Sequence, residues 1–106
     1  MIERAKIREF SEAVARQFRP ERIILFGSYA HGAPTEESDV DLLVIMPFKG
    51  RCVRTSFEIR RRIHADFALD LLVRTPQAIA QRLAWGDCFI QEILEKGKIL
   101  YEAHHS

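Results

Sequence analysis

The sequence has few of the features that mark secreted, membrane-spanning or metal-stapled proteins. Its 106 residues include only two cysteines, Cys52 and Cys88, without the spacing of metal ligands, so both are expected to be reduced thiols. No apolar run approaches the 18 residues of a membrane span, and no basic-then-apolar leader is present. We therefore expect a cytoplasmic chain with no membrane contact.

An excess of one charge is also missing. Lysine and arginine total 16 against 15 acidic residues, a net charge of +1, so the composition contains no strong nucleic-acid signal. No repeat, linker or low-complexity segment divides the chain, and its 47% hydrophobic content suffices for one core but not two. We expect a single domain over residues 1–106, with His104 and His105 in a terminal tail that does not bind metal.

One motif stands out: Gly27-Ser28, then ten residues, then Asp39-Val40-Asp41. The apolar run Ile23 to Phe26 before it predicts a buried strand, and Gly27 allows a tight turn where a side chain would obstruct a phosphate. Ser28 is then expected to open a helix. Its hydroxyl and the free backbone N–H groups of the first turn would form an anion site. This half of the motif predicts a phosphate-binding turn.

The second half predicts a metal site. Asp39 and Asp41 are two residues apart on an expected strand, so both carboxylates project to one side while Val40 packs on the other. Paired carboxylates that face phosphates suit Mg²⁺, and two such ions roughly 4 Å apart stabilise the attacking and leaving oxygens of an in-line displacement. Either half alone is typical of an ordinary loop or strand entrance. Together they indicate nucleotidyl transfer.

These residues resemble the minimal nucleotidyltransferase domain family of the DNA polymerase beta superfamily, whose signature is Gly-Ser, ten residues, Asp-x-Asp. The resemblance covers nearly the whole chain, including residues 70–76 and 86–94. It implies an α/β (α+β) nucleotidyltransferase fold, a small mixed β-sheet of three to four strands flanked by helices, with ATP as substrate. His31 departs from the pattern, because relatives often carry Arg there.

The resemblance also implies a third catalytic and metal-binding carboxylate at Asp70. Local pattern supports this position independently, because Asp70 interrupts the strand-like run Ala68 to Val73, where a charge is costly unless it faces a metal, a partner or a cleft. Asp66 is the competing candidate, but it lies at a helix-to-strand junction where acids are common. We predict Asp39, Asp41 and Asp70 as the catalytic and metal-binding set, with Gly27 and Ser28 binding the nucleotide.

A partner is implied by resemblance alone. Minimal nucleotidyltransferases are commonly encoded beside a helical HEPN protein, an RNase toxin that the nucleotidyltransferase neutralises by moving AMP from ATP onto a tyrosine. Our first hypothesis is therefore an Mg²⁺-dependent protein adenylyltransferase that acts as the antitoxin. Two alternatives stay open: an antitoxin that inhibits its partner by occlusion, and an enzyme that modifies a small hydroxylated compound. The chain length leaves no room for an acceptor-binding appendage, which disfavours the second alternative.

Basic residues concentrate between residues 49 and 62, against the single acid Glu58. Most of them are expected on the solvated face of a helix. Alternatively, those in the loop before it reach a triphosphate or an acidic partner. The six residues are Lys49, Arg51, Arg54, Arg60, Arg61 and Arg62.

The spacing of apolar residues and the residues that end or cap helices predict the order of helices and strands. Helical spacing of apolar residues, proline and glycine stops, and the Thr75-Pro76 and Gly86-Asp87 caps delimit them. Gly97 is expected to end the last helix before a short strand at Ile99 to Tyr101. The expected helices span about 2–18 and 51–65, two more follow Thr75 and Asp87, and the strands span about 22–26, 39–46 and 67–73.

Overall fold

The computed structural model describes residues 2–103 and contains a mixed sheet with helices on both of its faces. The order of elements agrees with the capping residues of the sequence, since Thr75 and Asp87 each cap a helix through their side chains. The elements are α1 (Arg4–Phe18), β1 (Arg22–Phe26), α2 (Ser28–His31), β2 (Val40–Ile45), α3 (Cys52–Arg62), β3 (Leu69–Arg74), α4 (Pro76–Ala84), α5 (Cys88–Lys96) and β4 (Lys98–Glu102).

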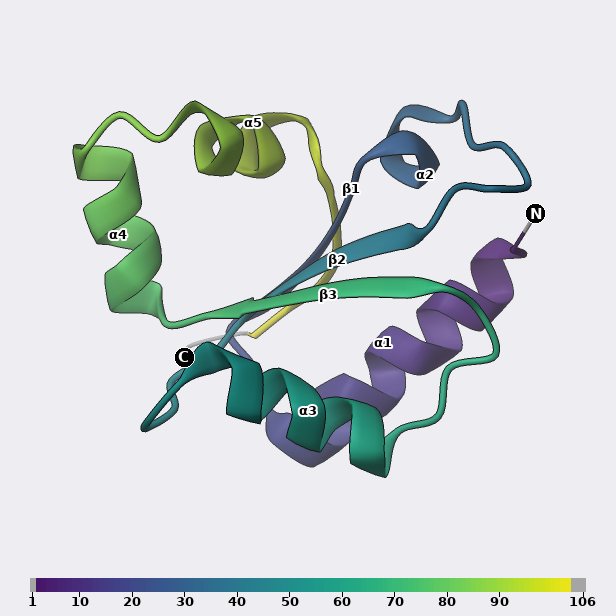
Figure 1. The fold of residues 1–106 in the computed structure, drawn as a ribbon, viewed down its shortest axis with the longest axis horizontal. Coiled ribbons are helices and arrows are strands. Elements are labelled where there is room, and N and C mark those ends of the chain that lie inside the picture. The colour runs from purple at the N-terminus through teal and green to yellow at the C-terminus, as the bar shows by residue number, and fades with distance from the viewer. Residues whose placement is uncertain (1, 104–106) are drawn as a thin grey trace.

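The four strands lie in the order β3-β2-β1-β4 (Figure 1). β1 is antiparallel to both β2 and β4, whereas β2 and β3 are parallel. Parallel neighbours need a crossover connection, and α3 supplies it between β2 and β3. The consequence for the site is that β2 and β3 begin at the same end of the sheet.

Successive side chains along each strand point to opposite faces of the sheet, so the buried apolar side chains form two clusters, one on each face. Val40, Leu42 and Val44 of β2 belong to the larger cluster, which includes residues of α1 and α3. Leu43 and Ile45 belong to the smaller cluster, formed with α4 and α5. Figure 1 shows this arrangement, with α1 and α3 below the sheet and α4 and α5 above it.

The expected α/β mixed sheet flanked by helices is confirmed, and it has four strands because the short segment after Gly97 pairs with β1 as β4. Several element boundaries were wrong by a few residues. The first helix begins at Arg4, and β2 begins at Val40, so Asp39 stands just before the strand. His104 and His105 lie outside the described residues.

The helix between β2 and β3 is also shorter than expected. It ends at Arg62 because Ile63 adopts an extended backbone and turns its side chain into the core. The residues that were expected to complete the helix form the connection to β3, which itself begins at Leu69 and not at Phe67. A buried apolar residue after the helix therefore set its end.

Side-chain hydrogen bonds, in place of a neighbouring strand, satisfy backbone carbonyls along the outer edge of β3. The carbonyl oxygens of Leu69, Leu71 and Val73 accept hydrogen bonds from Arg60 (2.7 Å), Ser56 (3.4 Å) and Arg74 (2.8 Å) respectively. Because Arg60 meets the start of β3 and Ser56 its middle, α3 runs antiparallel to β3 and its first turn lies level with the end of that strand. Capped carbonyls also make this edge a poor template for another strand.

None of the helices within residues 2–103 has the length and apolar content needed to cross a membrane.

Candidate active site

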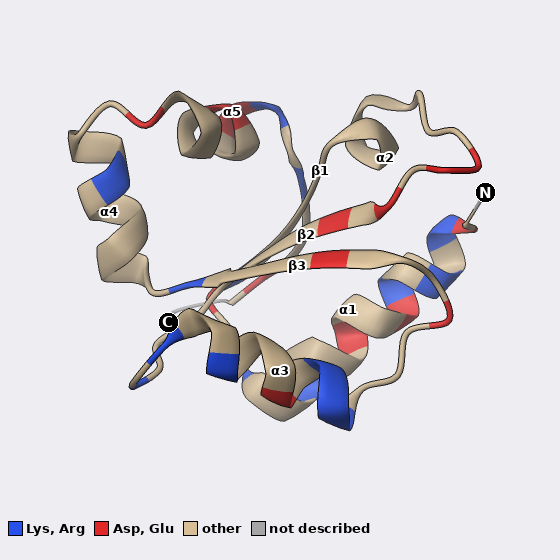
Figure 2. Ribbon diagram, viewed as in Figure 1, with Lys and Arg blue, Asp and Glu red and all other residues tan. Residues whose placement is uncertain are grey.

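Asp41 and Asp70 lie side by side on β2 and β3. They are register partners in the parallel pair, and alternation places both on the sheet face shared by Leu43 and Ile45. Figure 2 shows the two acidic positions next to each other on the adjacent strands. Two residues 29 positions apart in the sequence thus form one carboxylate pair, in which Asp70 is exposed and Asp41 is partly buried.

Gly27, directly after β1, lies next to the Asp41 carboxylate on the other side of β2 from Asp70. Phe26, the last residue of β1, is the register partner of Asp41, and the backbone at Gly27 has a φ of 74°, a conformation that L side chains rarely adopt. A Cβ at this position would collide with Oδ2 of Asp41. The missing side chain therefore makes the space into which the Asp41 carboxylate fits, which is a stronger requirement for glycine than the turn alone.

Ser28 opens α2, as expected. The helix has only four residues, and the Gly27 carbonyl accepts hydrogen bonds from Ala30 (3.0 Å) and His31 (3.2 Å). Such a short helix has a small dipole, so anion binding here would depend on the local N–H groups and the Ser28 hydroxyl. Phosphate binding by Gly27 and Ser28 stays a prediction.

Burial and neighbouring negative charges both act on the carboxyl group of Asp41. Burial, followed by the nearby charges of Asp70 and Asp39 and a hydrogen bond shared with Asp70, raises the pKa of Asp41 from 3.8 to about 6. Asp39 is exposed one residue before β2, yet it acts on the same carboxyl group. All three predicted acids therefore contribute to one concentration of negative charge.

A hard cation fits this donor set, because every candidate ligand is a carboxylate oxygen. Within residues 2–103, no three His, Cys, Asp or Glu side chains are grouped closely enough to form a complete metal centre. Mg²⁺ does not require such a cage, since it is usually held by one or two carboxylates together with substrate phosphates and water. The assignment of Asp39, Asp41 and Asp70 as metal ligands stays a prediction that the donor chemistry supports.

Asp66, the competing candidate, lies elsewhere. It precedes β3, and its Oδ1 lies 2.9 Å from Nε2 of His64, with both side chains largely exposed. It makes no contribution to the raised pKa of Asp41, whereas Asp70 makes the largest contribution of any charge. Of the two acids, Asp70 is the one that shares the site with Asp41.

Most of the basic residues between positions 49 and 62 lie away from this site, except Arg60, which donates a hydrogen bond to the carbonyl of Leu69, the neighbour of Asp70. α3 packs through Ile59, and the chain just after it through Ile63, against the opposite face of the sheet. The first turn of α3 lies level with the end of β3, away from Asp70. Arg61 and Arg62 pair with Glu58 at 2.6 and 3.0 Å on the exposed side of the helix. The hypothesis that Lys49, Arg51 or Arg54 reaches a bound triphosphate is therefore disfavoured by the fold.

Sequence reasoning missed a small hollow of about 190 Å³ beside Gly27. Phe89 of α5 packs edge-on against Phe26, with ring centroids 5.8 Å apart, and remains 52% exposed. Lys96 and His31 also line the hollow. The Gly86-Asp87 cap predicted helix α5, but only the packing of α5 against β1 brings these side chains beside the turn at Gly27 and Ser28.

Comparison with known proteins gives consistent results. The nucleotidyltransferase domain family matches residues 7–101. A Methanocaldococcus jannaschii protein named "putative protein adenylyltransferase MJ0604" is 31% identical over 103 residues, which cover 95% of this chain and 100% of that protein.

Among solved structures, a "putative nucleotidyltransferase" from Sulfolobus solfataricus superposes with a TM-score of 0.57 at 24% identity, over 73% of this chain and 70% of that one. This likeness shows a shared fold. The family match includes every residue from Gly27 to Asp70, so the whole candidate site lies inside it.

Proposed function

The chain belongs to the nucleotidyltransferase domain family and is a nucleotidyltransferase, and from this premise we propose that it moves AMP from ATP to a hydroxyl group of a protein. The M. jannaschii relative, which aligns along its entire length, is named as a protein adenylyltransferase, and this supports a protein as acceptor. A small hydroxylated compound is the less favoured acceptor.

The observation that carries the proposal is the convergence of Asp41, Asp70 and Gly27. Register pairing across β1, β2 and β3 brings two carboxylates together at a turn whose glycine leaves room for one of them. Nucleotidyl transfer needs a cradle for phosphates and negative ligands for the metal that accompanies them.

In the proposed reaction, the acceptor hydroxyl oxygen bonds to the α-phosphorus of ATP, and the bond from that phosphorus to the β-phosphate bridging oxygen breaks. Pyrophosphate leaves, and AMP stays on the acceptor. Asp70, exposed at the edge strand, takes the hydroxyl proton as general base, and the turn at Gly27 and Ser28 binds the phosphates.

Asp39, Asp41 and Asp70 are the residues that would hold Mg²⁺, with two ions in our proposal. When bound, Mg²⁺ neutralises phosphate charge and orients the α-phosphate for in-line displacement. The raised pKa of Asp41 supports this role, because mutual repulsion among the acids is relieved when a cation binds.

The acceptor we propose is a tyrosine of a HEPN-type toxin, so that the chain acts as the antitoxin of a toxin–antitoxin pair in the cytoplasm. The resemblance to minimal nucleotidyltransferases supports this partner. A docking protein would bring its own hydroxyl to the site.

The test uses the purified chain and the purified protein encoded beside its gene. Incubation with ATP and Mg²⁺ should raise the mass of the neighbour by one or more AMP units in intact-mass spectrometry. Asp41→Asn and Ser28→Ala should abolish the increase, and chelation by EDTA should abolish it in the wild-type chain. Asp66→Asn is the control and should retain transfer.

Two results would contradict the proposal and favour one of its alternatives. A neighbour that these variants silence as well as the wild-type chain does, without any mass change, would establish inhibition by occlusion. Transfer of AMP to small hydroxylated compounds, with the protein left unmodified, would establish the small-molecule alternative.

A further inference from the structure

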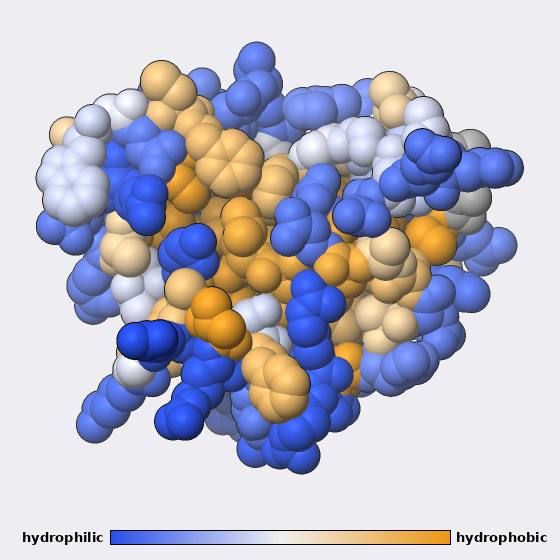
Figure 3. Space-filling model, in the orientation of Figure 1, coloured by the Kyte–Doolittle hydropathy of each residue, from blue (hydrophilic) through white to orange (hydrophobic). Residues whose placement is uncertain are grey.

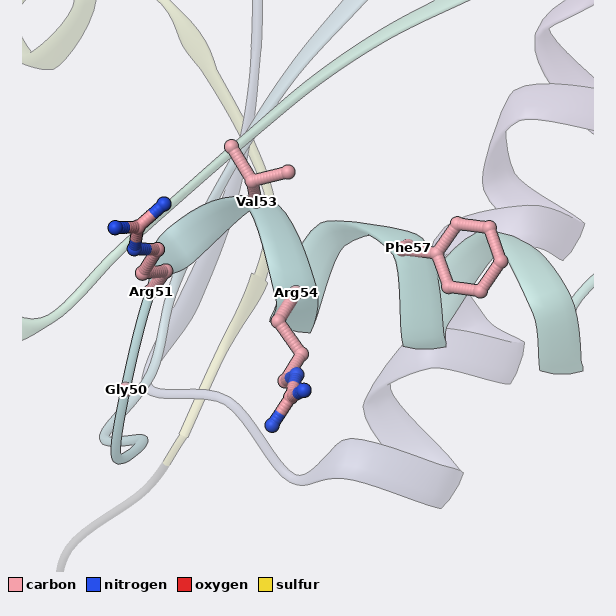
Figure 4. Close-up of a pocket in the computed structure, with 5 residues that line it drawn as sticks. All are labelled: Gly50, Arg51, Val53, Arg54 and Phe57. Carbon is pink, nitrogen blue, oxygen red and sulfur yellow. The ribbon is translucent and has the colours of Figure 1, made fainter.

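The outer face of α3 exposes two large apolar side chains to solvent. Val53 is 73% and Phe57 64% exposed, and with Gly50, Arg51 and Arg54 they line an open hollow of about 720 Å³. Figure 4 shows Val53 and Arg54 projecting from the first turn of α3 and Phe57 from the next turn, with Arg51 just before the first turn. We call Arg51, Val53, Arg54 and Phe57 the α3 surface.

The charges of the α3 surface are free to meet a partner. Within residues 2–103, Arg51 and Arg54 form neither an ion pair nor a side-chain hydrogen bond, whereas the other helix arginines are used. Arg61 and Arg62 are neutralised by Glu58, and Arg60 caps the Leu69 carbonyl. Two unpaired guanidinium groups thus flank two exposed apolar side chains.

The α3 surface lies beside the edge of the sheet that carries Asp70. β3 is the edge strand, Asp70 is exposed on it, and α3 runs along its outer side. Figure 3, drawn in the orientation of Figure 1, shows hydrophobic side chains gathered across the centre of this view, between α3 below and α5 above. A protein seated on α3 can therefore extend over β3 to the carboxylate pair.

We propose that the α3 surface docks an acidic, apolar segment of the acceptor protein, an inference that rests on the proposed function and names how its acceptor is held. Arginine and aromatic residues are enriched in protein interfaces, where they combine apolar burial with ionic and hydrogen-bonding contacts. The carboxylates of such a segment pair with Arg51 and Arg54, while its apolar side chains cover Val53 and Phe57.

The chemistry of the α3 surface favours a protein over a nucleic acid. Val53 is the most exposed of its apolar residues and has no aromatic face for stacking a base, and only two free guanidinium groups are available for phosphates. The whole chain has a net charge of +1, which provides no broad electrostatic attraction for a polyanion.

The experiment uses the full chain and the purified neighbouring protein as probe. Two double variants change the α3 surface, Val53→Ser with Phe57→Ser and Arg51→Glu with Arg54→Glu. All four side chains are exposed, so circular dichroism and melting temperature should stay near wild type. Ile99→Ser, at an apolar side chain 54% exposed on β4, and Arg16→Glu on α1 are the matched controls.

Binding is measured by calorimetry, and transfer is measured at varied concentrations of the neighbour. Each double variant should weaken binding by at least about tenfold and raise the KM for the protein acceptor by a similar factor. The kcat at saturating acceptor and the KM for ATP should stay within about twofold of wild type, because docking is separate from the reacting atoms. Asp41→Asn should show the opposite pattern, with docking retained and transfer lost.

The outcomes separate this inference from the proposed function. If the neighbour binds through the α3 surface but receives no AMP, the proposed function fails and the docking site stands. If AMP is transferred and the double variants behave as wild type, the docking inference is wrong and the proposed function stands. Loss of binding to a poly-uridine RNA in those variants, with protein binding unchanged, would assign the surface to nucleic acid and overturn the inference. A wild-type chain that neither binds nor modifies the neighbour contradicts both.

Discussion

The two faces of the sheet divide stability from chemistry. On one face, α1 and α3 cover β1, β2 and β3 with a continuous apolar cluster in which Val14, Leu42 and Ile59 are almost completely buried. On the other face, α4 and α5 cover only one part of the strands, and Asp41 and Asp70 stand beyond the smaller cluster. Charged groups that must meet a ligand are confined to the incompletely covered face, because a buried unpaired carboxylate would be too costly.

The comparison also explains the raised pKa of Asp41. The fully covered face contains one buried polar residue, Ser11, whose hydroxyl donates a hydrogen bond to the Arg8 carbonyl (2.9 Å), and among residues 2–103 no buried side-chain polar atom is left without a partner. On the open face, Asp41 is partly buried, and the like charges of Asp70 and Asp39 stand beside it without a counter-charge. Buried polar groups on the covered face therefore have hydrogen-bond partners, whereas the carboxylates on the open face, where a ligand is expected, still repel one another.

The largest effect should come from the open face. Asp70→Asn removes the proposed proton acceptor and should lower the transfer rate by about a thousandfold, equivalent to about 4 kcal/mol in the barrier. Folding should be unaffected, because the Asp70 side chain is exposed. Single-turnover kinetics with radiolabelled ATP measures the rate, with Asp66→Asn as the control. The assignment fails if the Asp66 variant loses activity and the Asp70 variant keeps it.

An intermediate effect should come from the covered face. Ile59 of α3 is completely buried in the larger cluster, so Ile59→Ala should lower the free energy of unfolding by about 3 kcal/mol through lost burial and a residual cavity. Urea titration followed by circular dichroism measures it. The affinity for ATP should stay within about twofold of wild type in the folded protein. A variant with intact stability and impaired ATP binding would contradict the division between the faces.

The smallest effect concerns the charge of Asp41. In the folded chain its pKa is raised to about 6, so the folded state binds this proton more tightly than the unfolded state. Stability from this group is therefore present below about pH 4 and is lost as pH rises to about 6. Asp41→Asn should remove that loss and stabilise the metal-free chain at pH 7.5 by about 1 kcal/mol, a value reduced for solvent screening.

Urea titrations in EDTA between pH 4 and pH 8 test this expectation. The two curves should converge below pH 4 and diverge toward pH 6. A constant difference across the whole range would show that Asp41 does not titrate as its surroundings require. Mg²⁺ added at pH 7.5 should stabilise the wild-type chain more than the variant, because metal binding favours the ionised carboxylate.

The amino-acid sequence alone determined the order of the elements and the local chemistry of the motif. Periodicity, caps and glycine stops are local signals, so the predicted helices and strands agree with the structure to within a few residues at most ends. The prediction that Gly27 ends a strand and Ser28 opens a helix needed no long-range information. The boundaries that were wrong, at Asp39 and after Arg62, depend on strand pairing and on the burial of Ile63.

Only the tertiary structure decided which residues meet. The parallel register of β2 and β3 pairs Asp41 with Asp70 and leaves Asp66 outside, and the antiparallel pairing of β1 with β2 sets Gly27 against Asp41. The packing of α3 on the opposite face moves Arg51 and Arg54 away from the site and leaves them unpaired beside the edge strand. Strand register and helix packing are fixed by side chains far apart in the sequence, so no local pattern contains them.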